Sequence, residues 1–387
     1  MAGLEQLLAS REIAVFAGSG GVGKTTTAAA TALMASTHLG GKVLVLTVDP
    51  ARRLANAMGL RSFGNIETPV PAEAFEAAGI RPRGQLWAAM LDTKASWDDL
   101  VRRHAPDPRT RDRILANPLY ENISGRFVQS HDYIAMERLH EIHSSGRYDL
   151  VVVDTPPTRN ALDLLEAPER MAEFFTSRLL RLLTAPSRSR LLTLASRPFY
   201  EVADRILGSQ FLGDISEFFS LFQTMEAGFI ERARAVQRVL TDRRTTFAVV
   251  TTLEAAPVAE ADFFIDELVR GRHHVGAVIM NRTLPQAMLA PSAAGAADIV
   301  RERSDELAAA LLDGPDAATA ARVLVEIGAN FRNLELVARR EAEHRRRFAG
   351  RAATLAEVPW LAEDITDLGG LSRLGEQLRR PVDPSAG

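Results

Sequence analysis

The stretch VFAGSGGVGKTTTAAA, residues 15–30, decides the fold. Its residues 18–25 match the phosphate-loop pattern G-x-x-x-x-G-K-[ST]. An apolar run at 12–18 predicts a strand before the loop, and residues 24–39 predict a helix after it. Glycines let a backbone wrap closely around phosphates, and a helix N-terminus favours anions. A glycine-rich turn that binds nothing would not need a strand directly before it and a helix directly after it. We therefore expect this loop to bind a nucleotide.

The loop residues have distinct expected roles. Lys24 is expected to reach the β- and γ-phosphates and to take part in catalysis, and the hydroxyl of Thr25 is expected to ligate Mg²⁺. ATP and Mg²⁺ are therefore the expected cofactors. The predicted nucleotide-binding positions in and just after the loop are Gly18, Ser19, Gly20, Gly21, Val22, Gly23, Lys24, Thr25 and Thr26.

Two aspartates end apolar runs further along the chain. Asp154 ends the run LVVVD, where the carboxyl edge of a parallel sheet places an aspartate that holds Mg²⁺, here through water. Asp49 ends the run VLVLTVD and precedes Pro50. We expect Asp49 to orient the water that attacks the γ-phosphate, which is catalysis mainly by positioning. A helix cap or a turn residue is the alternative for Asp49, because aspartate favours both positions.

The remaining apolar runs predict an α/β fold. Continuous apolar strands of this kind are buried on both faces of a parallel sheet. We expect one P-loop NTPase domain over residues 1–387, with a doubly wound, mainly parallel sheet and an inserted helical subdomain. Its helical insertions are expected at about 95–145 and 160–242, and a C-terminal helical segment at about 294–350. The further predicted strands are 42–49, 86–92, 148–155, 245–252, 274–281 and 354–359.

Composition and charge restrict the function classes. The 387 residues carry a net charge of −3, so no global basic field favours nucleic acid, and we expect no nucleic-acid partner. The chain has no cysteine, which excludes disulfides and thiolate metal sites. We find no signal-peptide pattern and no apolar run of about 18 residues, so we expect a cytoplasmic protein without an integral membrane segment. A peripheral membrane contact stays open.

Several motifs together resemble the ArsA/GET family of arsenite-pump and tail-anchored-protein targeting ATPases. TVDPARRL (47–54) resembles the family's switch I, and VVDTPPTRNALDLL (152–165) resembles its switch II. The resemblance places the water-positioning aspartate on Asp49 and the Mg²⁺-side aspartate on Asp154. It also implies that Asn281, at the end of a late strand, reads adenine, and that Pro359 in VPWLAEDITDLGGL (358–371) packs on the same base. The family implies an ATP-hydrolysing dimer.

The sequence departs from the family pattern at Ser19. The family has a lysine there, which crosses the dimer interface and neutralises charge on the partner's nucleotide; a serine cannot do this. Arg52, Arg53 and Arg159 lie beside the switches and are candidate replacements, although each also fits a solvated surface arginine. A paralogue that keeps the lysine could instead complete a heterodimer.

The absence of cysteine is the second departure. Arsenite-pump members of the family hold As(III) with thiolates, and targeting members clamp their dimer with zinc on a C-x-x-C pair. Neither chemistry is available to this chain, so arsenite transport through thiolates is disfavoured.

The helical insertions leave a choice between a core and a client groove. One stripe at helical spacing consists of Phe211, Ile215, Phe218, Phe222, Met225 and Phe229, and the segment 171–183 is also apolar. A stripe of this kind usually packs in a core; the alternative is an apolar groove for a protein client.

From the sequence we therefore expect an Mg²⁺-dependent ATPase that acts as a dimeric switch and couples its nucleotide state to a client or partner through the helical subdomain. The switch would be a homodimer or a heterodimer with a paralogous ATPase. The alternative is a weakly active nucleotide-binding regulatory subunit of a hetero-oligomer.

Overall fold

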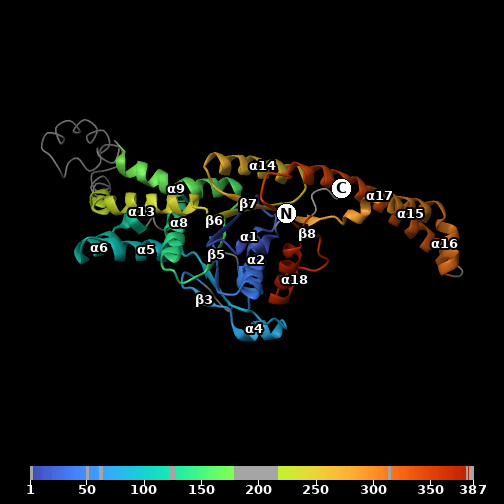
Figure 1. Cartoon of the computed structure of the whole chain (residues 1–387), viewed down its shortest axis with the longest axis horizontal. Coiled ribbons are helices and arrows are strands. Elements are labelled where there is room, and N and C mark those ends of the chain that lie inside the picture. The colour runs from blue at the N-terminus through green and yellow to red at the C-terminus, as the bar shows by residue number, and fades with distance from the viewer. Residues whose placement is uncertain are drawn as a thin grey trace.

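The computed structural model in Figure 1 describes residues 3–48, 52–60, 64–121, 128–177, 217–312, 315–380 and 382, with the backbone alone at 52–53, 128–131, 158–160 and 315. An eight-stranded sheet in the order β3-β4-β2-β5-β1-β6-β7-β8 forms its centre. Every described pairing is parallel except that of β3 with β4. The strands are β1 (Ile13–Ala17), β2 (Lys42–Thr47), β3 (Thr68–Pro69), β4 (Gln85–Met90), β5 (Leu150–Asp154), β6 (Thr245–Thr251), β7 (Val275–Thr283) and β8 (Thr354–Pro359).

The strand order confirms the doubly wound, mainly parallel sheet. From β1 the sheet extends through β5, β2, β4 and β3 on one side and through β6, β7 and β8 on the other. Every residue of β1, β5 and β6 is buried, which is why these segments read as continuous apolar runs. Alternate residues of β1 enter two different cores, with Ile13, Val15 and Ala17 on one face and Ala14 and Phe16 on the other.

Helices cover both faces of the sheet. The face of Ala14 and Phe16 carries α1 (Leu4–Leu8), α2 (Lys24–His38), α3 (Arg52–Ala57), α4 (Ala72–Ala77) and α18 (Leu368–Arg379). The face of Val15 carries α5 (Thr93–His104), α8 (Val128–Ser144), α9 (Thr158–Thr176), α13 (Glu226–Thr241) and α14 (Ala255–Arg270), and α6 (Pro108–Leu115) packs beside α5. A Cβ at Gly375 would lie 3.1 Å from the carbonyl oxygen of Ala30, so this glycine lets α18 approach α2 closely.

Three further helices form an arm that projects from one end of the sheet. α15 (Pro291–Glu302), α16 (Ser304–Leu311) and the long α17 (Pro315–Arg347) extend to the right in Figure 1. The short 3-10 helix η2 (Gln286–Leu289) leads from β7 into the arm, and α17 returns the chain to β8. None of the helices in the described part of the chain is long and apolar enough to span a membrane.

The aromatic stripe packs in the core wherever the structure describes it. Phe218, Phe222, Met225 and Phe229 are buried, whereas Phe211 and Ile215 lie outside the described residues. The ring centroid of Phe229 lies 4.9 Å from that of Phe175 and 5.3 Å from that of Phe222. The expectation of one continuous helical stripe was wrong. A turn at 224–225 separates the helical residues 217–223 from α13, and the amide of Met225 bonds to the carbonyl of Phe222 at 3.0 Å.

Candidate nucleotide-binding site

The glycine-rich loop connects the carboxyl end of β1 to the first turn of α2. Two glycines show why larger residues do not fit. A Cβ at Gly18 would lie 2.0 Å from the carbonyl oxygen of Val250, and a Cβ at Gly23 would lie 2.3 Å from Nδ2 of Asn281. Gly23 also has a φ of 93°, a left-handed conformation that glycine adopts without strain, and it caps α2. The loop therefore turns its backbone towards the N-terminus of a 15-residue helix, the arrangement that favours a bound phosphate.

Lys24 is the first residue of α2 and folds back over the loop. Its side chain is buried, and Nζ donates a hydrogen bond to the carbonyl oxygen of Ser19 at 2.9 Å. The ammonium group is thus held within the loop rather than in bulk solvent. This position lets Lys24 contact the oxygens of a phosphate bound by the same loop.

Asp154 lies at the carboxyl edge of the sheet between two neighbouring strands. It pairs in register with Phe16 of β1 and with Thr47 of β2, and it is fully buried. Its Oδ2 accepts hydrogen bonds from Oγ1 of Thr25 at 2.7 Å and from Oγ1 of Thr47 at 3.0 Å. The structure therefore brings together the two residues that the sequence assigned to Mg²⁺, and adds Thr47, which the sequence did not single out.

The Thr25 and Asp154 side chains suit a magnesium ion. A hydroxyl and a carboxylate are hard oxygen donors of the kind Mg²⁺ prefers, and Mg²⁺ usually takes few protein ligands beside phosphates and water. The close contact between Thr25 and Asp154 holds both oxygens beside the phosphate loop. Within the described residues no group of three or more histidine, aspartate or glutamate side chains could hold a metal on its own.

Asp49 lies outside the described residues, so its side chain cannot be placed. The chain reaches this position along the same sheet edge, because the amide of Val48 donates to the carbonyl of Asp154 at 3.1 Å. The proposed role of Asp49 therefore rests on the sequence and on this approach of β2. For Arg52, Arg53 and Arg159 the structure describes the backbone alone, so these three candidates stay predictions from the sequence.

Ser19 does not offer its side chain to a partner molecule. The residue is 9 % exposed, and within the described part of the chain its Oγ has no hydrogen-bond partner. The neighbouring residues Gly20 and Gly21 are exposed. The loop thus exposes the backbone of Gly20 and Gly21, next to the buried serine that stands where the family has a lysine.

Asn281 ends the buried part of β7 and contacts the phosphate loop directly. Its Nδ2 donates to the carbonyl oxygen of Val22 at 2.7 Å, and its Oδ1 accepts from the amide of Arg282 at 3.0 Å. The next residue, Arg282, has a φ of 59°, which is uncommon for a residue with a side chain. Arg282 therefore marks an irregularity in β7, which resumes its pairing with β8 at Thr283, opposite Pro359.

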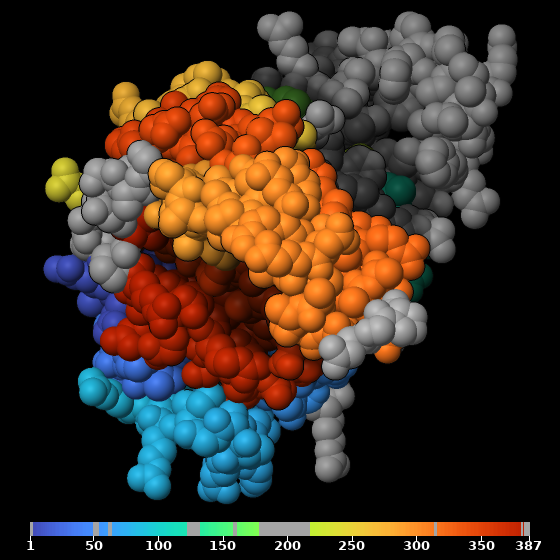
Figure 2. Space-filling view, turned by 90° about the vertical axis from the view of Figure 1, so that its right-hand side faces the viewer, coloured from blue at the N-terminus to red at the C-terminus, as the bar shows by residue number. Residues whose placement is uncertain are grey.

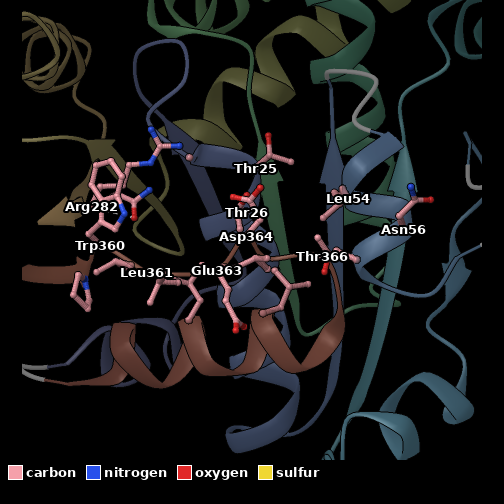
Figure 3. Close-up of a pocket in the computed structure, with 18 residues that line it drawn as sticks. Thr25, Thr26, Leu54, Asn56, Arg282, Trp360, Leu361, Glu363, Asp364 and Thr366 are labelled. Atoms are coloured by element: carbon pink, nitrogen blue, oxygen red, sulfur yellow. Dashed lines mark hydrogen bonds between the residues drawn. The ribbon is translucent and has the colours of Figure 1, made fainter. Parts of the chain in front are cut away.

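A cavity of about 1040 Å³ adjoins the loop and combines four separate segments of the chain. Its volume lies at the upper end of the range of roughly 300–1,000 Å³ for ligand pockets. In Figure 3, Thr25 and Thr26 lie between Leu54 and Asn56 at one side and Arg282 and Trp360 at the other. Asn281 and Pro359 also line it, whereas residues 18–22, Lys24 and Asp154 are not part of its lining.

Several lining residues were not predicted from the sequence. Trp360 follows Pro359 and is 68 % exposed, and its amide donates to the carbonyl of Thr283 at 3.0 Å, which pins this segment to the end of β7. Figure 3 shows Arg282 and Trp360 together at the same end of the cavity. The sequence did hold a signal for Trp360, because this tryptophan stands next to Pro359 in the segment that resembles the family's base-binding element. Asn56 and Leu54 gave no such signal.

The base of the arm braces this end of the cavity. Glu341 of α17 is buried and its Oε2 accepts a hydrogen bond from the amide of Leu284 at 2.8 Å, just beyond Arg282. Burial raises the pKa of Glu341 above its ordinary value. Arg345, also buried, forms an ion pair with Glu357 of β8. The segments that carry Asn281 and Pro359 are therefore both tied to α17.

We expect Trp360→Ala to weaken ATP binding about tenfold, because stacking of a base on an aromatic ring contributes roughly 1–3 kcal/mol. Trp360→Phe keeps a stacking surface and is expected to stay within about threefold of the wild type. Equilibrium titration with ATP measures both. If Trp360→Ala binds ATP as tightly as the wild type, the base does not lie at this end of the cavity.

Comparison with known proteins gives a family match over most of the chain. The model of the anion-transporting ATPase family matches residues 11–297, which include the loop, both aspartates and Asn281. An uncharacterised protein of Streptomyces coelicolor is 32 % identical over 237 residues, which are 60 % of this chain and 52 % of that protein. A putative arsenical pump-driving ATPase of Chlorobaculum tepidum is 29 % identical over 167 residues, 41 % of this chain and 36 % of that protein.

A third relative aligns over a longer stretch. An ATPase ASNA1 homolog of Trypanosoma cruzi is 28 % identical over 313 residues, 75 % of this chain and 78 % of that protein. Against four other relatives, the Streptomyces and Chlorobaculum proteins among them, the chain matches only 36 to 53 % of their length. Pro359, Trp360 and most of the arm lie beyond residue 297, where the family match ends.

Proposed function

The chain belongs to the anion-transporting ATPase family, and from this premise we propose that it binds ATP with Mg²⁺ at the phosphate loop and in the cavity beside it, and hydrolyses it as a dimeric switch. The observation that carries the proposal is the contact of Thr25 with Asp154 directly beside the loop that holds Lys24. These three side chains come from β5 and from the first turn of α2, and the fold holds them at one edge of the sheet.

Lys24 and the loop backbone would bind the phosphates. The ammonium group of Lys24 now donates to the carbonyl of Ser19, and it can exchange this partner for β- and γ-phosphate oxygens without moving far. The loop amides add donors at the N-terminus of α2. Mg²⁺ held by Thr25, and by Asp154 through water, would neutralise charge on the β- and γ-phosphate oxygens.

Asp49 is proposed to orient the attacking water. It follows Val48, whose amide bonds to Asp154, so switch I starts at the same edge as the phosphate loop. A carboxylate there can accept a proton of the water and point its oxygen at the γ-phosphorus, which lowers the barrier mainly through positioning.

Asn281, Pro359 and Trp360 are proposed to bind the adenine. Asn281 lies between the phosphate loop and Arg282, and Pro359 and Trp360 form the wall at the same end of the cavity. An amide side chain can pair with the donor and acceptor atoms on an adenine edge, while the proline and tryptophan rings offer apolar surfaces to its faces.

Switch II gives the nucleotide state a route to the helices. α9 starts at Thr158, four positions after Asp154, and packs against α8 and α13 around Phe175 and Phe229. We propose that ordering of Asp154 and of the residues after it shifts α9 and so changes the surface that a client or partner contacts. The described part of the aromatic stripe is core, so any client groove would use other residues.

A weakly active regulatory subunit is the second candidate function, and Ser19 favours it. The side chain at this position is short, buried and uncharged, so it supplies no cation to the nucleotide of another subunit. A lysine-bearing paralogue could supply that charge in a heterodimer. Anion transport through thiolates is not proposed, because the chain contains no cysteine.

The specific ATPase activity of the purified chain, measured over a wide range of protein concentration, separates the two candidates. A homodimeric switch predicts activity per molecule that rises with concentration and then levels off, because only paired subunits hydrolyse ATP. Activity that stays negligible at every concentration, although ATP binds, would contradict the homodimeric switch and support the regulatory subunit.

A further inference from the structure

Most of the exposed large hydrophobic side chains that the structure describes belong to the arm. Among the described residues, nine of the 14 large hydrophobic side chains that are exposed belong to the arm. Figure 2 looks at this end of the molecule and shows the arm, in orange, above the red segment that contains α18. A concentration of exposed apolar side chains on one part of a molecule is typical of an interaction site. The nine residues are Ile299, Leu311, Leu312, Val323, Val325, Ile327, Leu334, Leu336 and Val337.

α17 packs against α15 and α16 through one face. Ala321, Gly328, Glu335 and Ala342 recur every seven residues and are all buried against the rest of the molecule. A Cβ at Gly328 would lie 2.7 Å from the carbonyl oxygen of Ala297, so α15 crosses α17 at very short distance here. These contacts do not use the exposed apolar residues of α17. Nearer the C-terminal end of α17, Glu341 and Arg345 are buried as well, against Leu284 and Glu357, so the side of the helix that carries Val337 is exposed only up to that residue.

A second stripe on α17 has the spacing of a coiled-coil seam. Val323, Ile327, Asn330, Leu334 and Val337 follow one another in steps of four, three, four and three, and all five are exposed. At about 100° per residue they fall within roughly 80° of the helix circumference. A narrow stripe with this 3.5-residue period is the seam by which one helix packs against another.

The polar residues of the seam point to a helix of the same sequence as its partner. Glu326 and Arg340 flank the seam on its outer side, both are exposed, and neither is in an ion pair within the described residues. In an antiparallel pair of identical helices that sets Ile327 opposite Val337, Glu326 of each copy meets Arg340 of the other. Asn330 lies within the seam and faces Leu334 of the other copy in this register, where a polar residue lowers the stability of the pair. A lipid surface would gain nothing from these three groups.

We propose that α17 forms an antiparallel helix pair with α17 of a second copy of this chain. The contact lies on the arm and involves none of the nucleotide-binding residues, so it holds two chains together without ATP. Glu341 and Arg345 join the same helix to the segments that carry Asn281 and Pro359. The pair therefore connects the adenine ends of two cavities through one continuous helix on each side.

Sedimentation of the full chain without nucleotide tests the pairing. The wild type is expected to form dimers at or below about 100 µM, the range in which even a weak specific pair is detected. Ile327→Glu with Leu334→Glu is expected to raise the dimer dissociation constant at least about 100-fold, because each copy loses two buried apolar anchors. Circular dichroism checks that the helix content is unchanged.

Val325→Glu with Leu336→Glu is the matched control. Both side chains are exposed on α17, and both lie away from the seam. This pair of substitutions adds the same charge to the same helix and is expected to leave the dissociation constant within about threefold of the wild type. A wild type that stays monomeric, or seam and control variants that behave alike, would overturn the proposal.

Charge reversal tests the antiparallel register. Glu326→Arg and Arg340→Glu are each expected to weaken the dimer about fivefold or more at low salt, because each places like charges opposite each other twice. The double variant restores opposite charges and is expected to restore the wild-type constant. A double variant no tighter than the single variants would overturn the antiparallel register.

Discussion

Lys24→Ala is expected to abolish measurable ATP binding, with a dissociation constant at least about 100-fold higher than that of the wild type. The buried ammonium group is the one side-chain cation that the first turn of α2 offers to the phosphates. A hydrogen bond between charged groups contributes roughly 1.5–3 kcal/mol, and Lys24 is placed to make more than one. Equilibrium titration with ATP and Mg²⁺ measures the loss.

Lys42→Ala is the matched control for this substitution. Lys42 starts β2 at the opposite edge of the sheet, and its side chain is exposed. We expect this variant to bind ATP like the wild type, since it removes the same charge far from the loop. Thermal unfolding of both variants shows whether the fold is intact. If Lys24→Ala binds ATP with wild-type affinity, the phosphate loop does not bind the phosphates of ATP.

Asp49→Asn is expected to leave ATP binding within about threefold of the wild type and to lower kcat at least about 100-fold. Asparagine keeps the size of the side chain and loses the carboxylate that orients and deprotonates water. The phosphates are bound by other residues, so affinity is spared. Titration with ATP and steady-state phosphate release measure the two quantities separately.

Asp316→Asn controls for the loss of one negative charge. Asp316 lies exposed in the first turn of α17, on the arm, and the variant is expected to hydrolyse ATP at the wild-type rate. If Asp49→Asn also turns over at the wild-type rate, Asp49 is a cap or turn residue and another group orients the water.

The sheet could be predicted because the composition of its strands fits few other secondary structures. Segments such as LVVVD and TTFAVVT hold an uninterrupted apolar run of four residues and are rich in β-branched residues, which is the pattern of a strand buried on both faces. β3 was missed, since a two-residue strand carries no periodicity. The break at 224–225 was missed for a related reason: the apolar spacing continues through the turn although the helix does not.

The site could be predicted only in part. The loop pattern fixes which residues meet the phosphates, because loop, strand and helix are adjacent in sequence. The contact of Asn281 with Val22 joins residues 259 positions apart, and no local pattern announces it. The same holds for Thr47, which meets Asp154 only because β2 and β5 are neighbours in this register.

The arm shows a second limit. α15, α16 and α17 fall within or overlap the range 294–350, but apolar residues at helical spacing look the same whether a helix buries them or exposes them. α17 has both kinds of stripe, one through Ala321 and Gly328 and one through Ile327 and Leu334. Only the packing of α15 and α16 shows which stripe is free to bind a partner.

Phosphate release by the purified chain, with saturating ATP and with or without Mg²⁺, is the most direct test of ATP hydrolysis at this site. The wild type is expected to release phosphate only when Mg²⁺ is present, and Lys24→Ala is expected to release none above background. A wild type that binds ATP and releases no phosphate at any protein concentration would contradict an ATPase built on Lys24, Thr25 and Asp154.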